Sequence, residues 1–294
     1  MTARKDFLQS LTLGKKSEPT AEYAPSLRSP WRASEEEILL STRIENQIRE
    51  AVSKNQFKLY YQPIFRAEDQ KLYGFETLLR WDEGTFDKSI SPEQVITTAE
   101  ESGQILVIGQ WILAEAFKQF EQWNEKYNTN IKLTINVSPK QLLDKDWLTN
   151  LKKLLEDTKI RKENIIFEIT ETAIVEQMKK MVATLNKTTE LGFLFLVDDF
   201  GTGYSSLQYI QQLPVCGVKI DKSFIQSIDE RKKQVEKATL AESIFAMVEN
   251  LHLIAVAEGV ETASQLAFVK RYPNSLVQGY YLSNPCPQKM QPND

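Results

Sequence analysis

The sequence predicts an α/β fold, a TIM-like (β/α)8 barrel, from three observations. Some eight short apolar segments typical of strands alternate with helical segments along most of the chain. The chain has 294 residues, 41% of them hydrophobic and 26% charged, and one barrel domain fits this length. The first two strands are joined by the short connection 66–71, which is too short for a crossover helix. We therefore expect one antiparallel strand near the start of the barrel.

The elements are predicted in order from their apolar patterns and their start signals. Acidic residues directly after Ser34 indicate the first helix, and Ser138-Pro139 would start another helix well. Strands are expected at 57–65, 72–81, 131–137, 164–169, 193–197, 218–220, 254–257 and 276–282. The other helices are expected at 38–51, 92–100, 105–127, 175–191, 205–212, 237–251 and 263–271.

The two ends of the chain are expected to lie outside the barrel. Residues 1–33 mix Lys, Ser, Pro and Thr without a clear period, which predicts a flexible N-terminal tail. The barrel domain is expected at 34–286 and a C-terminal tail at 287–294. The tail carries four basic residues: Arg4, Lys5, Lys15 and Lys16. By default we interpret their charges as solvated, and the alternative is that they help the tail to contact a protein partner.

Charge and hydropathy exclude several classes of function. The net charge is −4 and the pI about 5.4, so the chain has no overall basic field that would attract DNA or an anionic membrane. No apolar stretch approaches the length of a membrane span, and the segment 7–13 is too short and too polar for a secretory signal. We therefore expect a cytoplasmic protein.

Histidine and cysteine are scarce, which limits the chemistry further. His252 is the only histidine, so histidine-rich zinc sites are excluded, and we expect it to lie near a helix C-terminus. Cys216 and Cys286 are too few for a disulfide framework, and we interpret both as reduced structural thiols. Any bound metal must therefore be held by oxygen ligands.

Polar residues recur near the ends of the predicted strands, where barrel active sites lie. They are Glu76, Asn136, Glu168, Glu171, Asp198, Asp199, Lys219, Glu258 and Glu261. Singly, each is more simply a solvated residue, or for Lys219 a salt-bridge partner, but solvation alone does not explain so many equivalent positions. Oxygen donors of this kind favour Mg²⁺ or Mn²⁺, although carboxylates also take Ca²⁺. Two metals sharing an aspartate would activate water for attack on a phosphodiester, with Lys219 orienting it.

These motifs closely resemble the EAL family of cyclic di-GMP phosphodiesterases from about Ile44 to about Leu282. The matching segments, in the family's order and approximate spacing, are 61–64, 76–81, 136–138, 168–171, 198–207, 219–221, 258–261 and 278–280. The resemblance implies a hydrolase that converts cyclic di-GMP to linear pGpG and so lowers the level of this bacterial second messenger. It also implies two Mg²⁺ or Mn²⁺ ions per site, inhibition by Ca²⁺, and a homodimer.

By this resemblance each candidate residue has an expected role. Glu76, Asn136, Glu168 and Asp198 would hold the first metal, and Asp198, Asp199 and Glu258 the second. Lys219 would position the attacking water. Glu171 would fix the loop 199–206, which in the family links the metal site to dimerisation. The candidates on the substrate side are Gln62, Arg80 and Gln278.

One position departs from the family's usual signature, since Thr77 gives Glu-Thr-Leu where Glu-Ala-Leu is usual. Strand alternation puts Thr77 on the face opposite Glu76, toward the helices, so we expect activity to survive. Two alternatives stay open: a catalytically weak receptor that binds cyclic di-GMP or a partner protein, and a barrel whose carboxylates are ordinary polar residues.

Overall fold

The computed structural model describes residues 35–87, 89–127, 130–156, 158–202, 210–228 and 235–287. The predicted N-terminal tail, residues 288–294, and most of the predicted helix 205–212 lie outside this part of the chain. The strands are β1 (Phe57–Arg66), β2 (Leu72–Trp81), β3 (Lys132–Asn136), β4 (Ile165–Thr170), β5 (Leu194–Phe200), β6 (Gly217–Ile220), β7 (Ile254–Ala257), β8 (Leu276–Val277) and β9 (Cys286–Pro287). The helices are α2 (Glu35–Ser53), α3 (Pro92–Ser102), α4 (Ile105–Tyr127), α5 (Pro139–Leu143), α6 (Trp147–Glu156), the 3₁₀ turn Lys162–Asn164, α7 (Glu171–Glu190), α9 (Lys222–Gln226), α10 (Val235–Asn250) and α11 (Ala263–Val269).

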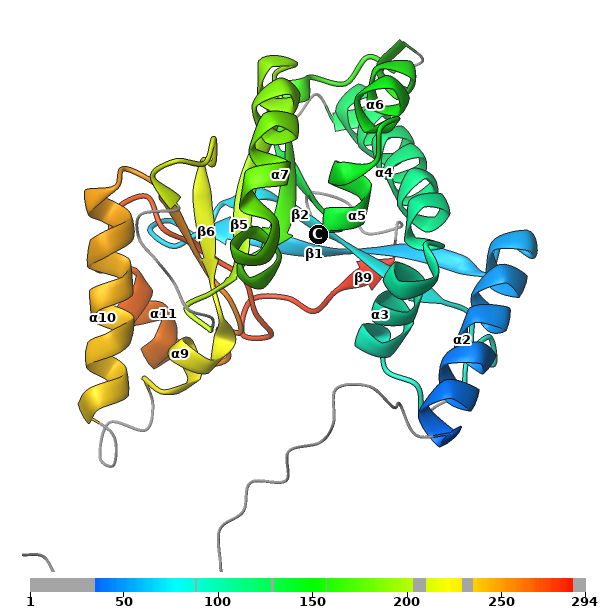
Figure 1. Cartoon of the computed structure of the whole chain (residues 1–294). Coiled ribbons are helices and arrows are strands. Elements are labelled where there is room, and N and C mark those ends of the chain that lie inside the picture. The colour runs from blue at the N-terminus through cyan, green and yellow to red at the C-terminus, as the bar shows by residue number, and fades with distance from the viewer. Residues whose placement is uncertain are drawn as a thin grey trace, which may run out of the picture. The chain divides into compact units, whose positions relative to one another are not determined.

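The strands close into the predicted barrel. Strands β2 to β8 follow one another in parallel, and β1 pairs antiparallel with both β2 and β8, which closes the ring. The single antiparallel strand near the start is therefore confirmed. Figure 1 shows β1 and β2 as a long two-stranded ribbon, with α4 to α7 on one side of it. The short β9 pairs with β1, so ordered structure reaches Pro287.

Strand alternation sorts the side chains of the barrel into two faces. The inner face carries an apolar layer, one residue from each of five strands: Ile64, Ile166, Leu196, Val256 and Leu276. Residues one position further along face outward into the main core, which includes Phe167, Val197, Ala257 and Val277. The next inward positions after the apolar layer are Glu168, Asp198, Glu258 and Gln278. Period-two alternation thus places the candidate site directly above an apolar floor.

Aromatic packing on the outer face holds the helices against the barrel. The ring of Phe167 lies 5.1 Å from Phe193 and 5.6 Å from Trp147 between centroids. The Trp147 indole donates to the Thr188 hydroxyl at 3.0 Å, so α6 and α7 share a satisfied polar contact inside the core. Such packing supplies most of the burial that stabilises a barrel.

Some predicted boundaries were wrong for local reasons. Strand β5 continues to Phe200 instead of ending at Val197, because a register shift lets the chain pair again with β6 at Ile220. Helix α7 begins at Glu171 rather than at 175. Strand β8 ends at Val277, since the chain turns at Gly279, where a side-chain carbon would lie 2.1 Å from the Val260 carbonyl oxygen.

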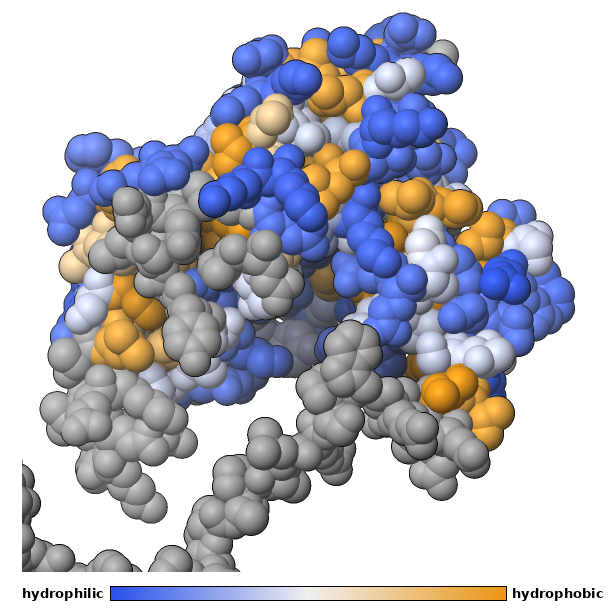
Figure 2. All heavy atoms as spheres, in the orientation of Figure 1, coloured by the Kyte–Doolittle hydropathy of each residue, from blue (hydrophilic) through white to orange (hydrophobic). Residues whose placement is uncertain are grey.

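The structure also bears on the chain's scarcer features. His252 follows the end of α10 as expected, and both cysteines are free thiols. Among the described helices, none is long and apolar enough to cross a membrane. Hydrophilic side chains cover most of the face shown in Figure 2, with hydrophobic residues in separate patches.

Thr77 is buried, and its register partner on β3 is Ile135, which belongs to the outer core. This placement agrees with the outward orientation expected from alternation. The Thr77 hydroxyl has no hydrogen-bond partner among the described residues.

Replacing Thr77 with Val is expected to raise the free energy of unfolding by about 1 kcal/mol, because it removes a buried, unsatisfied hydroxyl at nearly constant volume. Urea unfolding measures the change. Thr188→Val is the matched control: it should lower the free energy by about 1–3 kcal/mol, since the Trp147 N–H then loses its acceptor. A Thr77→Val variant less stable than the wild type would contradict the prediction.

Candidate active site

One ammonium group, that of Lys219 on β6, is the centre of the candidate site. Its Nζ lies 2.8 Å from carboxylate oxygens of Glu168 and Glu258, 3.2 Å from Asp198 and 3.3 Å from Glu76. The Lys219 side chain is only 1% exposed. The four carboxylates come from β2, β4, β5 and the residue after β7, so barrel closure alone brings them together.

Two amides hold the Glu76 carboxylate in place. Gln278 Nε2 donates to Glu76 Oε2 at 2.6 Å, and Asn136 Nδ2 donates to Glu76 Oε1 at 3.1 Å. Gln278 directly follows β8, and Asn136 ends β3. Gln62 on β1 is the antiparallel register partner of Glu76 and is partly exposed. Two candidates from distant parts of the sequence therefore hold one carboxylate, and Gln62 lies beside it in register.

Asp199 has an unusual backbone conformation that turns its side chain beside Asp198. Its φ is +53°, in the left-handed region, and its N–H donates to Asp198 Oδ1 at 2.9 Å. This conformation costs free energy in a non-glycine residue and is common at functional sites. Asp198, Asp199 and Glu258 each offer a carboxylate oxygen within 4.8 Å of the others, which forms a possible metal-binding trio.

The chain after Asp199 is tied to the start of α7. Glu171 Oε2 accepts a hydrogen bond of 2.8 Å from the N–H of Gly201, whose φ of +98° favours glycine. The Thr202 hydroxyl donates to the carbonyl of Asp199 at 2.8 Å. Glu171 is thus in contact with the first part of the loop 199–206, and residues 203–206 lie outside the described residues.

Burial and crowding raise the pKa values of the two carboxyl groups nearest to Lys219. Burial raises the pKa of Glu258 to about 8, because Lys219 only partly offsets the cost of desolvation and the repulsion from Asp198 and Glu76. Burial also raises the pKa of Glu168 well above its usual value. The pKa of Lys219 is raised well above its usual value, since burial favours the neutral amine but the surrounding carboxylates outweigh it.

The other two shifted carboxyl groups differ in direction. Burial would raise the pKa of Glu76, but Lys219 and the amides of Gln278 and Asn136 together lower it. Burial, Asp198 and Asp221 raise the pKa of Asp199, although Lys219 and Lys222 act in the opposite direction. The site therefore mixes a carboxylate stabilised as an anion with carboxyls that a cation would help to ionise.

The site borders a cavity of about 480 Å³ that Glu168, Asp198 and Asp199 line on one side, and residues of β2, α3, α4 and α5 on the others. Arg80 lines this cavity, and its Nη1 donates to the Leu79 carbonyl at 2.7 Å. Glu261 is exposed and does not belong to the carboxylate cluster. The structure thus joins the site candidates to the cluster, its supporting contacts or its cavity, except that Glu261 lies apart and Gln62 is placed only by its register with Glu76.

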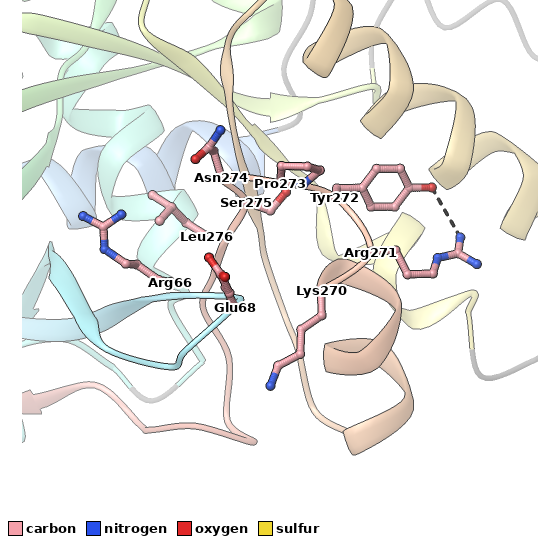
Figure 3. A pocket seen from close by; sticks show the side chains of 9 residues that line it. All are labelled: Arg66, Glu68, Lys270, Arg271, Tyr272, Pro273, Asn274, Ser275 and Leu276. Atoms are coloured by element: carbon pink, nitrogen blue, oxygen red, sulfur yellow. Dashed lines mark hydrogen bonds between the residues drawn. The ribbon is translucent and has the colours of Figure 1, made fainter.

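A second cavity of about 270 Å³ lies at the opposite end of the barrel, before β8. Its basic side chains do not converge: Figure 3 shows Arg66 and Arg271 pointing away from each other. Arg271 contacts the Tyr272 hydroxyl at 3.3 Å and Glu242 at 2.7 Å. The convergent polar groups are at the carboxyl end of the strands, as in barrel enzymes.

The donor set fits a hard divalent cation. All the candidate ligands offer oxygen, which suits Mg²⁺ and Mn²⁺. Glu168 Oε1 and Gln278 Oε1 are buried and have no hydrogen-bond partner among the described residues. These two oxygen atoms can therefore still accept a hydrogen bond or coordinate a cation. The acidic cluster therefore supports metal binding.

Sequence reasoning missed three residues of the site. The Thr134 hydroxyl is buried on β3 beside Glu76 in register, and no partner for it exists among the described residues. The Thr202 hydroxyl donates to the Asp199 carbonyl, and the positive charge of Lys222 opposes the rise in the pKa of Asp199. Two of them had a sequence signal, since Thr202 lies within the matching segment 198–207 and Lys222 directly follows Lys219-Ile220-Asp221.

Known proteins resemble this chain over most of its length. Cyclic di-GMP phosphodiesterase NbdA of Pseudomonas aeruginosa is 34% identical over 245 residues, which is 83% of this chain and 31% of NbdA. The chain spans about a third of the length of the curated relatives it matches.

Two solved structures share the fold. The PaMucR phosphodiesterase in complex with c-di-GMP superposes with a TM-score of 0.76 at 32% identity, covering 83% of this chain and 98% of that one. The EAL enzyme Bd1971 with cAMP and cyclic di-GMP bound superposes with a TM-score of 0.79 at 30% identity. The match covers 85% of this chain and 68% of that one. The model of the EAL domain matches residues 45–285. The chain therefore belongs to the EAL-domain family, which is related to cyclic di-GMP phosphodiesterases.

Proposed function

We propose that this chain is a Mg²⁺- or Mn²⁺-dependent phosphodiesterase that hydrolyses cyclic di-GMP to linear pGpG. The observation that carries the proposal is the buried cluster of Glu76, Glu168, Asp198 and Glu258 around Lys219, which borders a cavity of about 480 Å³ through Glu168 and Asp198. Membership of the EAL family and the names of NbdA and the PaMucR complex support this substrate.

The proposed ligands divide into two overlapping sets. Glu76, Asn136, Glu168 and Asp198 would hold one metal, and Asp198, Asp199 and Glu258 the second. When bound, the metals would supply Lewis acidity that favours hydroxide over water and offsets charge on the phosphate. The single acceptor shared by both sets is Asp198.

The remaining residues act on water and substrate. Lys219, held by carboxylates on several sides, would position the attacking water and offset developing negative charge. Arg80, on the cavity wall, would contact a substrate phosphate, and Gln62 would face the substrate beside Glu76. Because Gln278 donates to Glu76, we assign it a positioning role in addition to substrate contact.

The proposal extends to assembly. By resemblance, a homodimer would form with the loop 199–206 linking its interface to the metal site, and the N-terminal tail would be free to contact a protein partner. Glu171 would couple this loop to the barrel through Gly201.

Product analysis tests the activity. Purified protein with cyclic di-GMP and Mg²⁺ or Mn²⁺ is expected to yield linear pGpG, and Glu76→Ala to yield none, because the variant loses a ligand held by two amides. Added Ca²⁺ should reduce turnover. Nucleotide binding without turnover with either metal would reject the enzyme and support a receptor.

Glu171→Ala is expected to lower turnover by about 10- to 100-fold, since the N–H of Gly201 loses its acceptor and Asp199 loses support. Glu171→Gln keeps an acceptor oxygen and should retain most of the activity. Steady-state kinetics across a metal titration measure both variants. Equal activity of Glu171→Ala and the wild type would refute the coupling.

The raised pKa of Glu258 predicts a pH dependence in the presence of EDTA. Between its usual pKa and about 8, folded Glu258 binds a proton that the unfolded chain has released, so stability falls as pH rises through this window. Thermal unfolding at pH 5.5, 7 and 8.5 should show the wild type losing stability relative to Glu258→Gln. A constant difference between the two proteins would contradict the prediction.

A further inference from the structure

The Lys219 ammonium has more acceptors than it can serve. An ammonium carries three N–H donors, yet four carboxylates lie within 3.3 Å of Nζ. Glu168 and Glu258 are closest, at 2.8 Å, and the other two are 0.4–0.5 Å further away. The contacts with Asp198 and Glu76 are therefore the longer ones, at or beyond the upper end of the usual N–H···O range.

The charge around Lys219 is unbalanced when all four carboxyl groups are ionised. Glu76, Glu168, Asp198 and Glu258 contribute up to four negative charges against one positive charge. Among the described residues, no other cation comes within 4.0 Å of these carboxylates. Buried anions of this kind destabilise a fold unless a cation compensates them.

The residues that contact Lys219 overlap with the possible metal trio. Asp198 and Glu258 belong to both groups, whereas Asp199 has no ion pair with Lys219 within 4.0 Å. A divalent cation on the trio and the Lys219 ammonium would therefore draw on the same two carboxylates. Two cations so close also repel each other.

We propose that Lys219 is the built-in counter-ion of the acidic cluster, and that it competes with divalent metal for Asp198 and Glu258. Lys219 thereby keeps the barrel folded when metal is scarce and limits how tightly metal binds, so that the fold and metal occupancy are coupled through one side chain. This inference rests on the metal-dependent function proposed above and adds a role in setting metal affinity.

Lys219→Met tests the inference without any nucleotide. In EDTA the melting temperature of the variant should fall well below that of the wild type, because the carboxylates lose their cation. Saturating Mn²⁺ should then raise the melting temperature of Lys219→Met more than that of the wild type. In calorimetric titrations at pH 8.5, the Kd of Lys219→Met for Mn²⁺ should be lower than that of the wild type by about tenfold or more.

Lys132→Met is the matched control. Lys132 is another inward-facing strand lysine, but its Nζ donates to the Glu163 carbonyl and Asn164 Oδ1, each at 2.9 Å, at the other end of the barrel. Its loss should lower the melting temperature, yet leave the Mn²⁺-induced rise and the Kd for Mn²⁺ at wild-type values. A merely structural role for Lys219 would make the two variants behave alike.

A double variant keeps the test informative if Lys219→Met does not fold. Lys219→Met/Glu168→Gln replaces one of the two carboxyl groups nearest to the lost ammonium with a neutral amide, so it should fold and melt at a higher temperature than Lys219→Met. Failure of the double variant to recover any stability would overturn the counter-ion role.

The outcomes separate this inference from the proposed function. If Mn²⁺ raises the melting temperature of the wild type, and raises that of Lys219→Met by the same amount or less, the counter-ion inference fails while the metal site stands. If neither Mg²⁺ nor Mn²⁺ stabilises or binds the wild type, the metal-dependent function fails as well. Larger stabilisation and tighter binding in Lys219→Met would support the inference whether or not cyclic di-GMP is hydrolysed.

Discussion

The contact of Lys219 with four carboxylates is the interaction on which the arrangement of the site depends. Buried ion clusters contribute little net stability, because desolvation offsets most of the Coulombic attraction. The fold must therefore be stabilised elsewhere, by the apolar floor inside the barrel and the aromatic core outside it. That packing lets the polar layer be arranged for chemistry at a cost in stability.

The backbone after β4 and β5 completes the arrangement. A register shift in β5, the left-handed conformation of Asp199 and the bond from Gly201 to Glu171 turn a regular strand end into a fixed pair of carboxylates. Conformations of this kind persist only where surrounding contacts determine them. Glu171 is buried at the first turn of α7 and is the side chain best placed to do so.

The barrel and most of its site positions were predictable, because period-two alternation and strand order determine which residues share the inner face. The hydrogen-bond and ion-pair partners of each side chain were not predictable. Gln278 lies 202 positions from Glu76 and was expected to face the substrate, yet its amide holds the carboxylate. Closure of the ring by β1 and β8 creates this contact, and no local pattern encodes it. The left-handed Asp199 likewise follows from pairing with β6, which sequence spacing does not reveal.

The two roles of the carboxylates have a consequence for how variants of this site are interpreted. Glu168 and Glu258 are both proposed metal ligands and the nearest partners of Lys219, so removing either one changes metal binding and charge balance together. Lost activity in such a variant does not separate a lost ligand from a displaced lysine. Asp199 differs, because it belongs to the metal trio without an ion pair to Lys219 within 4.0 Å. A substitution at Asp199 therefore reports on metal binding with the least disturbance of the buried ion cluster.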